Sequence, residues 1–215
     1  MILHVLKHEL RLIFREPRFW IPFVIPPVIL AASQGIAVSR YGGQVMLGME
    51  GYMMLLLGCL MAPMGAPLAA DSFAGERERN SLELLQLSPV KPADLFWGKL
   101  LAVLPFPLIF ALIGQGAYWI AHSDISLEMG AAAMLGAASA SLLVNAFSLF
   151  LSLNAKTVRS ATQGTLFFIV PLLLIVQFCY EPFLDGIFIP AVTLVASLFI
   201  CAAVTVVGMR KFVNL

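Results

Sequence analysis

Residues 71–99 read DSFAGERERNSLELLQLSPVKPADLFWGK, a charged stretch that separates two long apolar runs. Its residues Glu76 to Arg79 are four consecutive charges, which the hydrocarbon of a bilayer cannot solvate. The stretch must therefore lie outside a membrane, where it can contact a soluble partner. We expect it to be the contact through which a membrane protein is driven.

The composition places the chain among integral membrane proteins. Its 215 residues are 60% hydrophobic and 12% charged, and their mean hydropathy of +0.94 lies above the range of soluble domains. Apolar runs of roughly 20 residues per span leave no room for a separate nucleotide-binding or catalytic domain. We therefore treat residues 1–215 as a single transmembrane domain and expect any energy source on another chain.

Six apolar runs are long enough, or nearly long enough, to cross a bilayer as helices, which predicts an all-α fold. They are Phe19 to Val38, Gly51 to Ala70, Leu100 to Ala121, Leu127 to Leu153, Thr165 to Tyr180 and Ile187 to Val207. An even number of spans puts both termini on one side. Twelve of the 13 Lys and Arg residues fall on that side and only Arg40 on the other. The positive-inside rule therefore predicts cytoplasmic termini in the inner (cytoplasmic) membrane.

The segment before the first span, residues 1–18, has the pattern of a basic amphipathic helix. Leucines recur there at helical spacing, while Lys7 and Arg11 mark another face. We expect a helix over Met1 to Glu16 that lies along the inner leaflet. Its leucines would then lie in the acyl region and its cations among anionic headgroups.

The part of residues 71–99 that follows the four charges predicts a short helix of its own. Asn80 is a good helix cap, and Glu83 three residues later completes a capping box. We expect this helix over Ser81 to Leu87, between the second and third spans, with its polar edge toward the cytoplasm. The next helix should begin at Pro92 and continue into the third span. A plain solvated loop is the weaker alternative, because connections between spans seldom need capped helices.

The predicted spans carry amides in place of charges. These amides are Gln34, Gln115, Asn145 and Gln177. Interhelical hydrogen bonding is their more common role, and a place along a substrate path is the alternative. The fourth span also has small or polar residues at intervals of four, namely Ala133, Ala137, Ser141 and Asn145. Such a stripe permits close helix packing, either within the chain or with a second copy.

The segment GERERNSLELLQLSPVKPADLFWGKLL, residues 75–101, closely resembles the connection between the second and third spans of type-2 ABC exporter permeases. REPRFWIPFVIPPVIL, residues 15–30, looks like that family's entry to the first span. The chain departs from the family pattern at Asn80 and Ser81, where the family has Gly and Thr. The resemblance also extends to the membrane subunit of haem exporters for cytochrome c assembly, although none of the three histidines lies in a predicted span to supply an axial ligand.

The resemblance implies a six-span permease that pairs with a second copy or a paralogous permease and binds cytoplasmic ABC ATPase subunits. Those subunits would bind ATP and Mg, so no cofactor is expected in this chain, and no nucleic acid is implied. The residues it assigns to ATPase coupling are Glu76, Arg77, Glu78, Arg79, Ser81, Glu83, Leu84 and Leu85. No metal site is expected either, because His4 and His8 lie one turn apart without a third ligand nearby.

Three classes of function remain to be compared. The leading one is the membrane subunit of an ATP-driven exporter for an amphipathic or apolar substrate. The alternative is an assembly or sensor subunit that docks a soluble partner through residues 71–99 without transport. An intramembrane enzyme is disfavoured, because the sequence has no HExxH motif, no paired carboxylates in the spans and no GxSxG motif.

Overall fold

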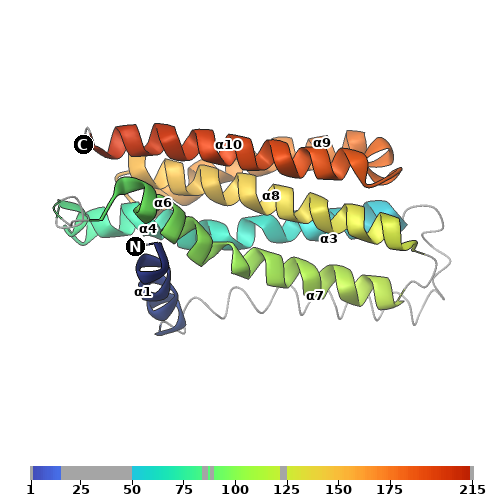
Figure 1. Ribbon diagram of the computed structural model, residues 1–215, viewed down its shortest axis with the longest axis horizontal. Helices are drawn as coiled ribbons and strands as arrows, with labels where there is room; N and C mark the ends of the chain where they lie inside the picture. The colour runs from blue at the N-terminus through green and yellow to red at the C-terminus, as the bar shows by residue number, and fades with distance from the viewer. Residues whose placement is uncertain (1, 16–49, 84–86, 88–89, 122–124, 214–215) are drawn as a thin grey trace.

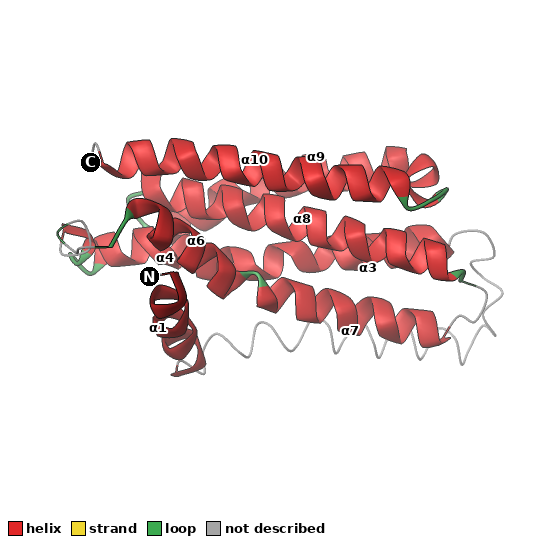
Figure 2. Cartoon of the chain, in the orientation of Figure 1, coloured by secondary structure: helices red, strands yellow, loops and turns green. Residues whose placement is uncertain are grey.

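The computed structural model describes residues 2–15, 50–83, 87, 90–121 and 125–213. These residues form helices joined by short connections, and no strand occurs within them (Figure 2). In chain order the helices are α1 (Ile2–Arg15), α3 (Glu50–Met61), the 3-10 helix η3 (Ala62–Gly65), α4 (Ala66–Glu78), α6 (Pro92–Val103), α7 (Pro105–Ala121), α8 (Leu127–Asn154), α9 (Val158–Leu184) and α10 (Phe188–Val213).

Five helical stretches within the described ranges are long and apolar enough to cross a membrane, which identifies a multi-pass membrane protein. They are Glu50–Glu78, Pro92–Ile120, Leu127–Asn154, Val158–Leu184 and Phe188–Phe212. The predicted first span, Phe19 to Val38, lies outside the described residues. The stretch Glu50–Glu78 continues past Ala70, where the predicted second span ends, so the first charges of residues 71–99 are helical. The stretch Val158–Leu184 also extends beyond the predicted Thr165 to Tyr180 at both ends, because polar residues continue a helix after its apolar run stops.

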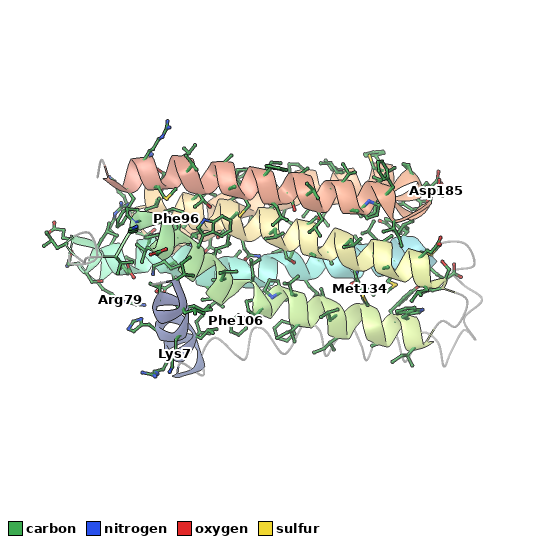
Figure 3. All side chains as sticks on the ribbon, viewed as in Figure 1. Lys7, Arg79, Phe96, Phe106, Met134 and Asp185 are labelled. Carbon is green, nitrogen blue, oxygen red and sulfur yellow. The ribbon has the colours of Figure 1, made fainter. Side chains whose placement is uncertain are left out.

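The long helices lie side by side, and the segments with functional signals share one end of the bundle (Figure 1). The charged end of α4, the start of α6 and the end of α10 lie there, and α1 lies beside the bundle at the same end, steeply inclined to the long helices. Arg79 and Asp185 lie at opposite ends of the molecule (Figure 3). The segments predicted to be cytoplasmic are therefore brought together in space.

Helix α8 is the centre of the bundle and contacts α3, α4, α7, α9 and α10. Its small-residue stripe from Ala133 to Asn145 is buried against the second span of the same chain. Asn145 Nδ2 donates to the Ala62 carbonyl at 3.1 Å, and Ser148 Oγ donates to that of Ala66 at 3.0 Å. Ser152 Oγ continues this row toward α4 by donating to the Ala70 carbonyl at 2.6 Å. The stripe therefore packs helices within one chain.

Gly58 of α3 packs closely against both Gln115 of α7 and Ala137 of α8. A Cβ atom there would lie 2.6 Å from Ala137 Cβ, so we expect Gly58→Ala to lower the free energy of unfolding by about 1–3 kcal/mol through overpacking. Gly114→Ala in α7 is the matched control, because nothing lies within 4 Å of its added Cβ. Alanine should there be neutral or stabilising by up to about 1 kcal/mol. Unfolding midpoints in detergent test this, and equal midpoints for the two variants would contradict the packing.

Helix α1 packs on the bundle in a way that differs from the sequence prediction. Ile13 is buried, and Leu6 and Leu10 are partly buried against the core cluster that includes Phe96. The apolar face of α1 therefore contacts protein over most of its length, where the pattern predicted lipid. Sequence periodicity shows that a face is apolar but does not show what covers it. The cations Lys7 and Arg11 are exposed, as the pattern predicts.

Candidate coupling site

Lys99 of α6 is a buried cation at the end of the bundle that carries residues 71–99. Its side chain is 1% exposed, and its Nζ atom lies 2.7 Å from Glu9 Oε1 of α1 and 2.9 Å from Glu76 Oε1 of α4. The ammonium also donates to the Ser72 carbonyl at 3.1 Å and lies 5.3 Å from the centre of the Phe73 ring. Its three protons thus have three oxygen partners.

This arrangement joins three helices through one charge. The carboxylates of Glu9 and Glu76 are 18% and 20% exposed, so water screens them weakly. A buried cation is stable only when it is paired and hydrogen-bonded. The ion pairs of Lys99 with Glu9 and Glu76 therefore hold α1 in a defined position against α4 and α6.

Arg77, the next residue of the four-charge motif, binds the end of a different helix. Its guanidinium donates to the carbonyl of Leu153 at 3.0 Å and to that of Ala155. These carbonyls belong to the last turn of α8 and to the residue that follows it, where no intrahelical donor is available. The positive charge of Arg77 also interacts favourably with the negative, C-terminal end of the helix dipole of α8.

Glu78 binds the start of the following helix, and Arg79 remains at the surface. Glu78 Oε1 accepts a hydrogen bond from the backbone amide of Val158 at 2.8 Å, at the N-terminus of α9, where negative charge is favourable. Arg79 pairs with Asp71 at 3.2 Å with its side chain 61% exposed. Three of the four motif residues therefore each bind a different helix of the bundle, and the fourth stays within α4.

Asn80 ends α4, and the structure corrects the prediction that it caps the following helix. Its φ of 55° is left-handed. The backbone amide of Asn80 donates to the Arg77 carbonyl at 3.1 Å, and the backbone amide of Ser81 donates to the Glu76 carbonyl at 2.9 Å. These two bonds form the Schellman ending of a helix. Asparagine suits both an N-cap and a left-handed residue, so the local pattern alone did not separate the two roles.

We expect Asn80→Val to lower the free energy of unfolding by about 1–2 kcal/mol, because a β-branched side chain clashes with the backbone in this conformation. Asn80→Gly should be close to neutral, since glycine adopts positive φ at no steric cost. Thermal unfolding of the two variants in detergent provides the comparison. Equal stability of the valine and glycine variants would contradict the left-handed helix ending.

The rest of the predicted coupling residues lie just beyond α4. Ser81 Oγ donates to the Glu76 carbonyl at 3.1 Å. Residues 82 and 83 are helical, Glu83 is exposed, and its carbonyl accepts from the Leu87 amide at 3.1 Å. Leu84 and Leu85 lie outside the described residues. The structure thus gives Glu76 and Arg77 partners inside the chain and leaves the Glu83 side chain open to a partner.

The predicted amides lie between helices. Gln115 is buried and donates to the carbonyls of Met54 at 3.1 Å and Ala133 at 3.0 Å. Asn145 is also fully buried, and its amide donates to the carbonyls of Ala62 and Ser141. Gln177 accepts a hydrogen bond from the Tyr52 hydroxyl, and Gln34 lies outside the described residues. These contacts connect α3, η3, α7, α8 and α9.

Sequence reasoning missed several residues that hold this end together. Ser148 and Ser152 continue the stripe beyond Asn145 at helical spacing, so the periodicity could have been extended to them. Glu9 is the one acid between residues 2 and 15, and Lys99 is the last charge before the third apolar run. Their opposite signs were visible, but their pairing depends on how α1 crosses α6.

Two comparisons with known proteins agree with this architecture. The pattern of the family described as ABC-2 type transporter matches residues 2–183. The ABC transporter permease protein NatB of Bacillus subtilis (strain 168) is 34% identical over 110 residues, a match that covers 44% of this chain and 28% of NatB. The chain thus spans 28% of the length of that relative. Because the family match covers most of its length and the described helices can cross a membrane, this chain belongs to the ABC-2 type transporter family.

Proposed function

We propose that this chain is the membrane-spanning permease subunit of an ABC exporter. It moves an amphipathic or apolar substrate across the cytoplasmic membrane, driven by ATP and Mg on a separate ATPase subunit. The observation that carries the proposal is the motif from Glu76 to Arg79, in which three consecutive side chains bind α6, α8 and α9. A partner that moves this motif moves those helices together.

In this proposal the exposed residues next to the motif receive the force, and the motif distributes it. Glu83 contacts the ATPase, and a displacement of its segment passes directly into the last turn of α4. Glu76 transmits it through Lys99 to α6 and α1, while Arg77 and Glu78 transmit it to α8 and α9. Charge-assisted hydrogen bonds suit this role, because they are roughly twice as strong as neutral ones and geometrically specific.

The same proposal orients the chain in the membrane. Both termini and residues 71–99 are cytoplasmic, in line with the distribution of Lys and Arg and with their shared end of the bundle. Lys7 and Arg11 of α1 then contact anionic headgroups, where each basic residue contributes about 1 kcal/mol to membrane binding. Helix α1 would thus hold the ATPase contact at the membrane surface.

A second copy, or a paralogous permease, completes the translocation path. Of the 18 consecutive residues of α9 that are most apolar, only 6% are buried within the chain. The corresponding share for the stretch Glu50–Glu78 is 67%. Helix α9 is therefore better placed than α3 to face a partner permease. Its exposed side chains include Leu166, Phe167, Val170 and Phe178, which suit an apolar or amphipathic substrate.

The test is to co-express the chain with its ATPase, purify the complex through a tag on the chain, and reconstitute it into lipid vesicles. We expect ATP hydrolysis that requires Mg and a particle mass corresponding to two permeases with two ATPase subunits. A vesicle containing the ATPase alone is the control. A chain that purifies without ATP hydrolysis would overturn the exporter assignment and favour the assembly or sensor alternative.

A further inference from the structure

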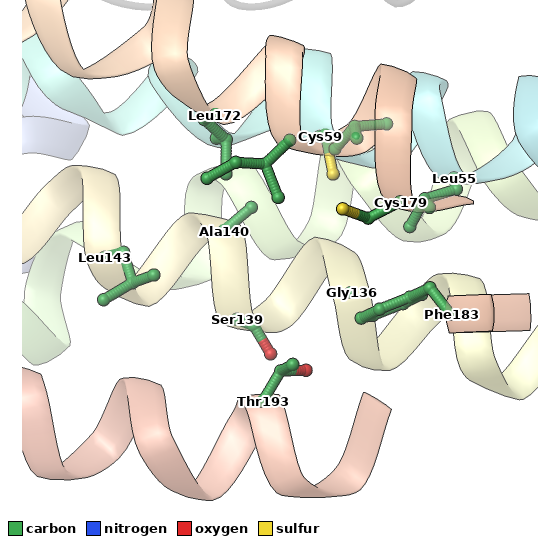
Figure 4. A pocket seen from close by; sticks show the side chains of 12 residues that line it. Leu55, Cys59, Gly136, Ser139, Ala140, Leu143, Leu172, Cys179, Phe183 and Thr193 are labelled. Atoms are coloured by element: carbon green, nitrogen blue, oxygen red, sulfur yellow. The ribbon is translucent and has the colours of Figure 1, made fainter. Parts of the chain in front are cut away.

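A cavity of about 180 Å³ lies between α3, α8, α9 and α10, away from the coupling site. Cys59 and Cys179 line it on the side of α3 and α9, and Ser139 and Thr193 on the side of α8 and α10 (Figure 4). Its other lining residues are apolar side chains and Gly136. The cavity is formed within one chain.

The hydroxyl groups of the lining are already used. Ser139 Oγ donates to the Leu135 carbonyl at 2.8 Å, and Thr193 Oγ1 donates to that of Pro190 at 2.8 Å. The two thiols are weak donors that behave as small hydrophobic groups. A polar ligand would therefore lose its hydration without finding strong hydrogen bonds. An apolar cavity of roughly 150 Å³ stays dry and binds a benzene-sized molecule, so hydrocarbon suits this site.

The cavity opens on the exposed side of α9. Ile175 lines it and is 60% exposed, and Cys179 is likewise exposed and lines it. The opening therefore lies on α9, within a membrane-spanning stretch. An α-helix of a second copy is roughly 10–12 Å across and too wide to enter such a space. A flexible acyl chain is narrow enough and is present at that depth.

We propose that this cavity binds the terminal segment, roughly six carbons long by the volume comparison, of one acyl chain of a bilayer lipid. The chain enters beside Ile175 and Cys179 and fills the space between α8 and α9. It supplies dispersion contacts that an empty cavity would lack. The site supports the position of α9, of whose 18 most apolar consecutive residues only 6% are buried within the chain, and it goes beyond the ATPase-driven function proposed above.

The experiment uses the full chain in phosphatidylcholine vesicles that contain a photoreactive phosphatidylcholine with a diazirine at the end of one acyl chain. After illumination, mass spectrometry measures lipid adducts on residues 136–143 of α8, which lipid reaches through the cavity. Ala140→Leu fills the cavity and should reduce these adducts about tenfold, since overpacking of 1.4 kcal/mol or more disfavours the bound chain. Leu172→Ala enlarges the cavity and should increase them.

Leu174→Ala is the matched control, because Leu174 lies on the same helix, is 52% exposed and is not part of the lining. Its adducts on residues 136–143 should equal those of the native chain. A diazirine placed next to the headgroup should label these residues far less than one at the chain end. Equal labelling of the native and Ala140→Leu chains, no change in Leu172→Ala, or cross-links to a second copy in place of lipid adducts would overturn the proposal.

Discussion

Replacement of Lys99 by methionine should produce the largest loss of stability of any single change at the candidate coupling site. The substitution keeps an apolar stem of similar length but removes the cation between Glu9 and Glu76, leaving two poorly solvated carboxylates facing one another. Breaking a buried ion pair from one side costs about 3–5 kcal/mol. We expect a fall of that size in the free energy of unfolding, measured by denaturation in detergent.

Two companion variants isolate the cause of that loss. Lys91→Met removes the same charge at an exposed position of the same segment and should change stability by less than about 1 kcal/mol. Adding Glu9→Gln and Glu76→Gln to Lys99→Met should recover much of the loss, because no buried charge then remains unpaired. The pairing is refuted if Lys99→Met is no less stable than Lys91→Met.

Arg77→Ala should have the next largest effect, because one side chain binds the final carbonyls of α8. Its hydrogen bonds to Leu153 and Ala155 carry a full positive charge, and hydrogen bonds of this kind contribute about 1.5–3 kcal/mol each. Without them the last turn of α8 should fray. We expect lower global stability and faster amide hydrogen exchange over residues 153–158.

Arg79→Ala is the natural comparison for Arg77→Ala, since the two arginines lie two residues apart. Arg79 forms a surface pair with Asp71 and is 61% exposed, so its removal should cost at most about 1 kcal/mol. Hydrogen exchange at the end of α8 should stay native in this variant. The same exchange rates in both variants would show that Arg77 does not hold α8.

The sequence predicted much of the fold because hydrophobic length and charge are set locally. Apolar runs located five spans within the described residues, and Pro92 marked the start of α6, where proline suits the first helical position. The length of α9 was underestimated, because a helix does not need apolar residues once it leaves the hydrocarbon. Asn80 was assigned to the wrong helix end, since its preference for caps and for positive φ is shared.

The candidate coupling site was predictable as a segment but not as a set of contacts. The four consecutive charges from Glu76 to Arg79 are visible in the sequence. The groups that they bind are backbone groups and side chains more than twenty residues away, such as those of Lys99, Leu153 and Val158. Such pairings are fixed by helix crossing, which periodicity does not encode. The apolar face of α1 shows the same limit, because its leucine spacing predicts an apolar face but does not predict whether lipid or protein covers it.

We propose that residues 71–99 couple this chain to an ATPase, and Glu83→Lys in the reconstituted complex tests that coupling. Glu83 is exposed next to the motif, so reversing its charge should disturb the partner without altering the spans. Glu128→Lys is the matched control, an exposed glutamate in the first turn of α8 at the far end of the bundle.

The quantity to measure is ATP hydrolysis per complex in lipid vesicles, with the amount of ATPase bound to the chain measured in parallel. Like charges placed together at an interface cost several kcal/mol, so we predict that Glu83→Lys lowers ATP hydrolysis or ATPase binding at least about tenfold. Glu128→Lys should retain native hydrolysis and binding. Native ATP hydrolysis with a fully bound ATPase in the Glu83→Lys complex would contradict the account.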